Sequence, residues 1–499
     1  MRERELKLSV GDTFVMPTLS DADVGVSAVR DLPELELGSV YHDTVDLRLA
    51  RSGVTLRYRI GDDEGPHWSL KLPVIGHDLT EREELSFEGG PADIPRAARD
   101  LVAAWTRRGH LAPAAALSTR RRRWMLTAED GAELAELVHD DVSVLDGERV
   151  VGRFRELELE SRGPELESLR PVVLLLQRAG ATPAEPVPKA VRALGPRAAA
   201  PPDIVVPAAD PAGPASEAVR VALATGARRL IVNDAPMRLG ESEGLHQMRV
   251  ATRRLRADLR TFAPLVDAQW AGALIDELRW LGDLLGAVRD RDVQLEALAT
   301  GDAALADALE PLCLAIAAAR GEARDLLLDA LGGARYLDLL ERLVQAAREP
   351  LLTLAASERA DKATHALLAT VARKTRRRLA SVAPDSPDET YHRGRIAAKR
   401  LRYAAEAIAP FTSRRRRRVA KIGSAATDVQ DLLGRLQDGL VMQAQVLETV
   451  AQRPKDAPFA LAAGRYFERL EADRLAIRAA YPKSRTALRR RLDRWAEDR

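Results

Sequence analysis

The first residues of the chain place three charged side chains at alternate positions. As a strand, the segment RERELKLSV would carry Glu3, Glu5 and Lys7 on one face and Leu6 and Leu8 on the other. Carboxylates are ligands that Mg²⁺ or Mn²⁺ prefers, and a neighbouring amine can contact a phosphate. An ordinary surface strand shows the same alternation, so this segment indicates a metal and phosphate site only together with the similar segments that follow it.

Later segments repeat the alternation, and each of them carries charge of one sign. The cationic faces hold Arg57, Arg59, Lys71, Arg121 and Arg123, and the acidic face holds Glu156, Glu158 and Glu160. Strands of this kind, closed into a barrel, would line a lumen with carboxylates on one wall and cations on another. Such a lumen suits a triphosphate, because carboxylates hold a metal, cations neutralise phosphate oxygens, and an activated water attacks phosphorus.

The four consecutive arginines at 120–123 leave the strand register open. Either Arg121 and Arg123 or the two alternate positions could face the lumen. We favour Arg121 and Arg123, because Trp124 and Leu126 then face outward.

A second ambiguity concerns the acidic residues before the last strand. Either Asp140 or Asp141 could be lumenal, and parity with Glu136 favours Asp140. His42 and His139 are expected to be structural or exposed, because nothing near them completes a histidine-based metal site.

In their order along the chain, these segments resemble the CYTH family, the triphosphate tunnel metalloenzymes, over residues 1–197. The family includes inorganic triphosphatases, thiamine triphosphatases and class IV adenylate cyclases. The resemblance implies a Mg²⁺ or Mn²⁺ cofactor and a catalytic Lys7 that binds phosphate or orients water. It also implies two sets of site residues: metal ligands Glu3, Glu5, Asp140, Glu156 and Glu158, with Glu160 as an alternative, and phosphate-binding Arg57, Arg59, Lys71, Arg121, Arg123 and Lys189.

The second part of the chain contains an internal duplication. Five residues recur with a displacement of 146: His246, Arg249, Arg253, Arg254 and Arg256 match His392, Arg395, Lys399, Arg400 and Arg402. The segment at 283–290, Asp-Leu-Leu-Gly followed by Asp, recurs at 431–438 with a displacement of 148. The repeat predicts two similar helical bundles.

The duplicated cations form a stripe on each helix. At 100° per residue, His246, Arg249, Arg253 and Arg256 fall within an arc of about 80°, with Arg260 inside it. The copy places His392, Arg395, Lys399 and Arg402 on an equivalent stripe. A solvated basic helix is the usual explanation of a charge run, but a pattern kept twice favours an anion along the stripe.

The composition narrows the nature of that anion. Aromatic residues make up 4% of the chain, whereas proteins that bind nucleic acids usually use aromatics for base stacking. The duplicated pattern resembles the CHAD family, the conserved histidine α-helical domains, over residues 215–499. The resemblance implies two pseudo-symmetric antiparallel bundles that bind inorganic polyphosphate. Further cation clusters at 373–378 and 414–418 are as typical of solvated helix ends as of an extension of this anion-binding surface.

Charge and composition divide the 499 residues into two parts. Residues 1–200 hold 27 Lys and Arg against 34 Asp and Glu, whereas residues 201–499 hold 49 against 40. The Pro-rich segment 198–214 is predicted to be a linker. We therefore predict a multidomain protein: an α+β N-terminal antiparallel β-barrel tunnel at 1–197 and a C-terminal all-α domain at 215–499. The all-α domain would hold two pseudo-repeated antiparallel bundles, at about 215–350 and 351–499.

These features predict a polyphosphate-associated protein in which a metal-dependent triphosphatase-like tunnel precedes a polyphosphate-binding domain. The alternatives are a non-catalytic component of polyphosphate granules and, less favoured, a nucleotide cyclase. A single cysteine and a charged N-terminus without a long apolar run favour the cytoplasm, with association to granules. The expected partners are polyphosphate and a short triphosphate substrate, with no membrane and no specific nucleic acid.

Overall fold

The structure is a computed structural model that describes residues 2–20, 25–74, 81–163, 166–184, 187–300, 305–412 and 415–497, without the side chains of residues 2, 3, 166, 496 and 497. The chain forms two compact units, Met1–Asp203 and Ile204–Arg499. Each unit is described by itself.

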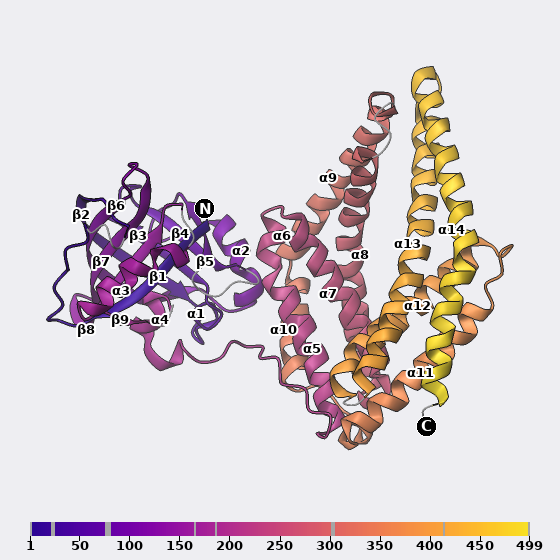
Figure 1. The fold of residues 1–499 in the computed structure, drawn as a ribbon, viewed down its shortest axis with the longest axis horizontal. Coiled ribbons are helices and arrows are strands. Elements are labelled where there is room, and N and C mark those ends of the chain that lie inside the picture. Colours follow the sequence, from indigo (N-terminus) through magenta and orange to yellow (C-terminus); the bar gives the residue numbers. More distant parts are fainter. Residues whose placement is uncertain are drawn as a thin grey trace. The chain divides into compact units, whose positions relative to one another are not determined.

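The first unit is built on an antiparallel barrel of eight strands (Figure 1). The strands are β1 (Arg2–Val10), β2 (Ala28–Asp43), β3 (Thr55–Ile60), β4 (His67–Pro73), β5 (Glu81–Phe87), β6 (Ala112–Thr127), β7 (Glu133–Asp146) and β8 (Arg149–Ser161). They pair in the order β5-β4-β3-β2-β6-β7-β8-β1, and β1 pairs with β5 to close the barrel. The short β9 (Thr182–Pro183) adds to β1. The predicted N-terminal barrel is confirmed.

The apolar side chains that alternate with the charged ones form a core outside the lumen. Leu157 and Leu159 of β8 pack with Leu126, Leu137 and Leu176, the last from helix α3 (Arg170–Arg178). In these strands the apolar face is covered by other apolar side chains, and the charges on the opposite face can be buried because they are paired. The alternation in sequence therefore leaves the charged set facing inward.

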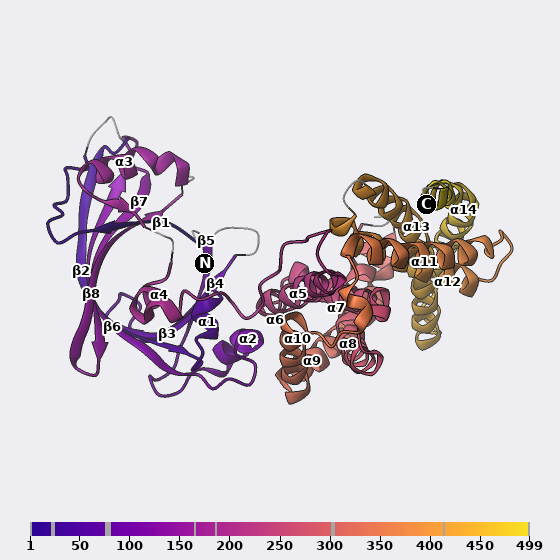
Figure 2. The ribbon, with the colours of Figure 1, turned by 90° about the horizontal axis from the view of Figure 1, so that it is seen from below.

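Shorter helices lie around the barrel: α1 (Arg48–Arg51), α2 (Arg96–Thr106) and α4 (Lys189–Leu194). Figure 2, which views the chain from below, shows α3 and α4 along different parts of the barrel. Ala190 of α4 packs with Tyr41, Leu117 and Val142, so this helix is anchored between strands.

The start of the predicted linker belongs to the first unit. Ala198 is buried with Leu47 and Val191, and Asp203 forms ion pairs with Arg51 (3.0 Å) and Arg107. Farther on, residues 211–214 hydrogen-bond within the second unit, where Gly213 O accepts from Ala360 N (2.8 Å). Each end of the segment is thus held by the unit next to it.

The second unit is helical. Its first half contains α5 (Ala215–Val232), α6 (Asp234–Arg238), α7 (Ser242–Thr261), α8 (Ala268–Ala299), α9 (Glu310–Gly332) and α10 (Ala334–Arg348). Its second half contains α11 (Ala360–Ala380), α12 (Asp388–Ile408), α13 (Arg416–Gln452) and α14 (Ala457–Glu497). Helix α7 packs on α5 and α8, α12 packs on α11 and α13, and α7 contacts α12. The predicted all-α part is confirmed; among the residues described, no helix is both long and apolar enough to cross a membrane.

A buried carboxylate fixes the end of β2. Asp43 is 5% exposed, and its oxygens accept hydrogen bonds from the backbone N–H groups of Thr44 (2.7 Å), Leu49 (2.9 Å) and Ala50 (2.8 Å). These bonds hold α1 against the strands, and the Thr44 hydroxyl adds a further cap by accepting from Arg48 N (3.0 Å).

Replacing Asp43 by Ala leaves three buried N–H groups without their acceptor. We expect Asp43→Ala to lower the free energy of unfolding of the first unit by about 2–4 kcal/mol. Hydrogen exchange of barrel peptides in a urea series measures this change. Asp93→Ala, at an exposed position, serves as the control, and equal stability of the two variants would contradict the assignment.

Candidate functional site

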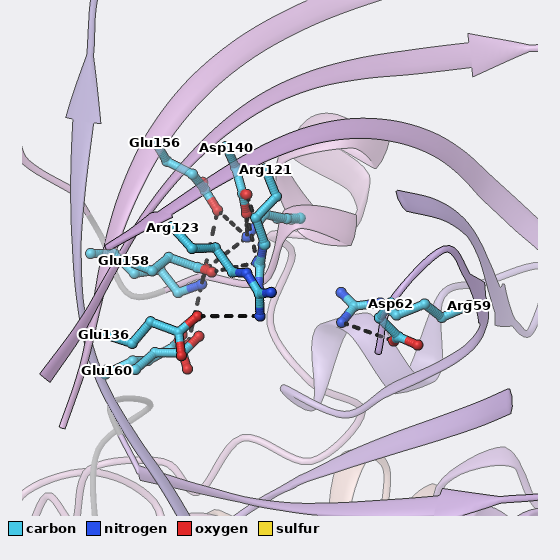
Figure 3. A network of polar contacts seen from close by, with 12 residues as sticks. Arg59, Asp62, Arg121, Arg123, Glu136, Asp140, Glu156, Glu158 and Glu160 are labelled. Atoms are coloured by element: carbon cyan, nitrogen blue, oxygen red, sulfur yellow. Dashed lines mark hydrogen bonds and ion pairs between the residues drawn. The ribbon is translucent and has the colours of Figure 1, made fainter. Parts of the chain in front are cut away.

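The barrel encloses a charged cavity of about 510 Å³. Its lining joins an acidic wall from β1 and β8 with a cationic wall from β3 and β4. Glu5, Glu158 and Glu160 face the cavity from the first wall, and Arg57, Arg59 and Lys71 face it from the second. Figure 3 shows Arg59 across an open space from the carboxylates.

Strand register brings the carboxylates together. Glu5 of β1 is opposite Glu160 of β8, and Asp140 of β7 is opposite Glu156. Two groups, Glu5 with Glu158 and Glu160, and Asp140 with Glu156 and Glu158, each offer three oxygens within 4.8 Å of one another. Glu158 belongs to both groups. Three carboxylates at this spacing are a donor set that suits a hard divalent cation.

One of these groups already holds a cation of the protein. Lys189 of α4 places its Nζ 2.9 Å from Asp140 Oδ2, 2.7 Å from Glu156 Oε1 and 2.7 Å from Glu158 Oε1. Lys7 forms ion pairs with Glu158 and with Glu5 (3.2 Å). Of the two groups, only Glu5, Glu158 and Glu160 lines the cavity with all three members.

The buried pairs hold their charges firmly. Burial alone would raise the pKa of Glu158, but Lys189, Lys7 and Arg121 outweigh it and hold the pKa well below its usual value. Burial would likewise lower the pKa of Lys189, but Asp140 and its neighbouring glutamates raise it well above the ordinary range. Both groups are therefore charged at neutral pH.

The cationic wall is less completely paired. Arg57 donates to the Tyr41 hydroxyl (3.2 Å) and to Glu84 (3.3 Å), and Lys71 forms an ion pair with Glu84 (3.1 Å). Burial and the neighbouring Arg57 and Arg121 lower the pKa of Arg59 to about 10. Its Nε is buried and has no hydrogen-bond partner among the described residues. An anion in the cavity would relieve this excess of positive charge.

The structure resolves both open choices of register. Arg121 and Arg123 line the cavity, and Arg121 donates to Asp140 (2.9 and 2.7 Å) and Glu158 (3.1 Å). Arg120 lies outside beside Glu36. Asp140 is fully buried, whereas Asp141 accepts from Arg155 (3.1 Å) on the outer side.

Glu3 lies opposite Arg82 in the β1–β5 ladder, and its side chain is outside the described part of the structure. The structure therefore does not test its predicted role as a metal ligand.

Several residues of the site were missed from the sequence, among them three of β5 and one of α4. Arg82 and Glu84 of β5 face the cavity with Ser86, in a strand whose alternation would have indicated them. Arg192 lies three residues after Lys189, hence on the same face of α4, and forms an ion pair with Glu156 (2.6 Å).

In the helical unit the two predicted stripes converge. Burial and the neighbours Arg253, Arg395, Arg249 and Arg256 lower the pKa of Lys399 to about 7. These neighbours come from both α7 and α12. The buried Nε atoms of Arg253, Arg256 and Arg395 have no hydrogen-bond partner within the described ranges.

Three of the other stripe residues, Arg249, Arg402 and His392, have partners in the protein. Arg249 forms an ion pair with Asp290 (2.6 Å), and Arg402 forms one with Glu406 (2.8 Å). His392 Nδ1 is 2.8 Å from Gln437 Oε1, and burial lowers the pKa of His246.

The duplicated Asp-Leu-Leu-Gly segments lie against the stripes. A Cβ added to Gly286 would lie 3.9 Å from Arg249 Nη2, and one added to Gly434 would lie 3.8 Å from Arg395 Nε. These distances are ordinary van der Waals contact, so each glycine lies beside the arginine of its stripe. The two duplicated motifs thus build one arrangement in each half. Of the further cluster at 414–418, Arg414 lies outside the described residues.

Comparison with known proteins finds two family matches. A CYTH domain model matches residues 1–180 and a CHAD domain model matches residues 221–447. An uncharacterized protein of Mycobacterium tuberculosis, Rv2226, is 30% identical over 483 residues, which is 89% of this chain and 88% of the relative.

Two solved structures match parts of the chain. The CHAD domain from the plant Ricinus communis is 28% identical, with a TM-score of 0.46, over 58% of this chain and 95% of that one. A putative adenylyl cyclase from Hippeastrum, described as having a dominant triphosphatase activity, is 18% identical, with a TM-score of 0.22, over 36% of this chain and 90% of that one.

The lowered pKa of Lys399 makes stability depend on pH. Between about pH 7 and pH 10, the unfolded chain keeps a proton that folded Lys399 has released, so the free energy of unfolding rises with pH. We expect Lys399→Met to flatten this rise between pH 7.5 and 9.5, measured by thermal unfolding of the helical signal. Lys362→Met, at an exposed lysine, should keep the wild-type slope; equal slopes in all three proteins would contradict the assignment.

Proposed function

Because the chain belongs to the proteins in which a CYTH domain precedes a CHAD domain, we propose that it hydrolyses a short phosphate chain in its tunnel and binds polyphosphate on its helical unit. The observation that carries the first part is the barrel cavity in which a carboxylate wall faces a cationic wall.

Glu5, Glu158 and Glu160 would hold the divalent metal, because all three line the cavity and their oxygens lie close together. The bound metal would supply a Lewis acid for a phosphate oxygen and for an attacking water. Asp140 and Glu156 are not part of the described cavity lining, and they would act indirectly, by holding Lys189 beside Glu158. Lys7, between Glu5 and Glu158, would contact a phosphate oxygen or orient water.

The cationic wall would bind the substrate. Arg57, Arg59 and Lys71, with Arg121 and Arg123, present donors for the oxygens of a linear phosphate chain. Tyr41 is the one Phe, Tyr or Trp side chain in the described lining, and Arg57 already uses its hydroxyl. His67 is the other ring in this lining, so recognition of a nucleobase would have few rings for stacking, which disfavours the nucleotide cyclase.

The helical unit would bind polyphosphate along the two stripes. Arg253, Arg256 and Arg395 each bury a donor that has no acceptor among the described residues, and Lys399 lies among four arginines. A flexible anion that offers only charge and oxygen acceptors satisfies such an array.

A purely binding protein is the second candidate, and one observation favours it. Lys189, Arg121 and Arg192 together already balance the three charges of Asp140, Glu156 and Glu158, so charge balance does not demand a metal there. The tunnel would then bind phosphate chains as part of a polyphosphate granule in the cytoplasm. Metal-dependent turnover distinguishes the two candidates.

Glu5→Gln removes one anionic metal ligand and keeps the size of the side chain. We expect metal-dependent release of phosphate from tripolyphosphate to fall by about two orders of magnitude or more. Assays with Mg²⁺ or Mn²⁺ on tripolyphosphate, long-chain polyphosphate, ATP and thiamine triphosphate measure the change. Glu34→Gln, an exposed carboxylate outside the barrel, is the matched control. If the wild type hydrolyses none of the four, the binding-only candidate replaces the enzyme.

Removing the central cations of both stripes tests the second part. We expect the change of Arg249, Arg253, Arg395 and Lys399 to Ala to weaken binding of long-chain polyphosphate by about two orders of magnitude and to reduce its salt dependence. The control removes as many exposed cations elsewhere, at Arg228, Arg465, Arg469 and Arg490. Similar losses in both variants, measured by titration at several salt concentrations, would show that net charge rather than the stripes decides binding.

A further inference from the structure

A second cationic pocket lies in the helical unit, apart from the tunnel and from the centre of the stripes. It has a volume of about 870 Å³ and is bounded by the end of α7, by α11 and by α12. We call it the α11 pocket, and its six cations are Arg260, Lys374, Arg377, Arg378, Arg393 and Arg400. Its described lining contains no Asp or Glu.

The protein offers these cations almost no counter-charge. Among the described residues, Arg393 alone has an ion pair, with Glu389 at 4.0 Å on an exposed helix turn. Burial and the neighbours Arg256, Arg400 and Arg279 lower the pKa of Arg260. All six cations are exposed, so water and salt screen part of their mutual repulsion, and an anion that joins them in this concave place would lower it further.

The internal duplication identifies the equivalent position in the other half, where the cation has carboxylate partners. A displacement of 146 relates Arg254 to Arg400 and Arg260 to Glu406. Arg254 forms ion pairs with Glu406 and with Asp258 (3.6 Å), so a cation and two carboxylates meet there.

In the α11 pocket, the residues that correspond to these two carboxylates carry no negative charge. Arg400 faces Arg260 where the other half has Arg254 and Glu406, and Ala404 stands at the position that matches Asp258. The side chain that covers the equivalent position differs as well. Buried Tyr403 lies beneath Arg254, with the guanidinium carbon 5.8 Å from the ring centroid, whereas its counterpart in the pocket lining is Ala257. Two carboxylates and a ring are thus replaced by a cation and two methyl groups.

We propose that the α11 pocket is a separate binding site for a compact anion that carries several phosphate groups. Four arginines and a lysine without ion pairs, together with Arg393, match the charge of such a ligand, and the planar guanidinium favours phosphate oxygens. The floor of the pocket is formed by small and aliphatic residues such as Val371 and Ile396, and its described lining contains no aromatic ring. The ligand is therefore recognised through its phosphates and not through a stacked base. A free oligophosphate and the end of a long chain share this chemistry.

Counting the bound ligand tests the site in the full chain. Equilibrium dialysis with tripolyphosphate, in a chelator that prevents metal-dependent turnover, gives the number of equivalents bound per chain. Arg260→Glu installs the counterpart of Glu406 beside Arg400, and we expect it to remove one equivalent. Arg377→Glu, at an exposed position that cannot affect the core, should remove the same equivalent. Arg373→Glu, on the same helix but outside the pocket lining, makes the same charge change and should leave the number as in the wild type.

The variants of the tunnel and of the stripes separate this inference from the proposed function. Glu5→Gln and the double change of Arg249 and Arg395 to Ala should keep the equivalent that Arg260→Glu removes. If the stripe variant removes that same equivalent, the pocket is a continuation of the stripes, and the separate site is wrong. If Arg377→Glu and Arg373→Glu bind alike, the pocket holds no ligand. Loss with long-chain polyphosphate but not with tripolyphosphate would assign the pocket to a chain end.

Discussion

Charges of one sign that a fold holds together away from water need a counter-charge, and this requirement shapes both units. Leaving a buried ion without its partner costs about 3–5 kcal/mol, so each cluster must find a partner inside the protein or take one from solution. The acidic wall of the tunnel has found internal partners in Lys7, Lys189 and Arg121. In the cationic wall and the helical stripes, the buried Nε atoms of Arg59, Arg253 and Arg395 have no hydrogen-bond partner among the described residues, and we therefore propose both as places for anions.

In the duplicated helical unit, the same sequence pattern occurs twice, but the contacts around it differ between the two halves. Its two halves keep the same stripe residues and the same glycine beside Arg249 and Arg395, so the central arrangement is built twice. At the periphery the halves differ, because Glu406 in one half corresponds to Arg260 in the other. One substitution in a duplicated contact turns an ion pair into a pair of like charges. Together with Ala404 and Ala257 in place of Asp258 and Tyr403, this difference leaves an open cationic pocket in one half.

Much of this architecture could be predicted from periodicity. Alternation with period two gave the barrel strands and the lumenal choice between Asp140 and Asp141, because one face of each strand must be apolar. The repeat gave the two bundles. What periodicity could not give are contacts between distant elements: the position of Lys189 among three carboxylates depends on how α4 packs, and the ion pair of Arg254 with Glu406 depends on where α7 meets α12. Neither distance is encoded in a local pattern.

Lys189 links the packing of α4 to the chemistry of the tunnel. Ala190, the next residue, is buried against Tyr41 and Val142, which anchors the helix and holds the ammonium at the carboxylates. Glu158 is shared between this group and the group that faces the cavity, so the charge that Glu158 offers to a metal depends on how strongly Lys189 and Lys7 hold it. A cation entering beside Glu5 and Glu160 competes with an internal ammonium for one carboxylate. In the proposed enzyme, the affinity of the cavity for a divalent metal would therefore depend on the anchoring of α4 as well as on the ligands themselves.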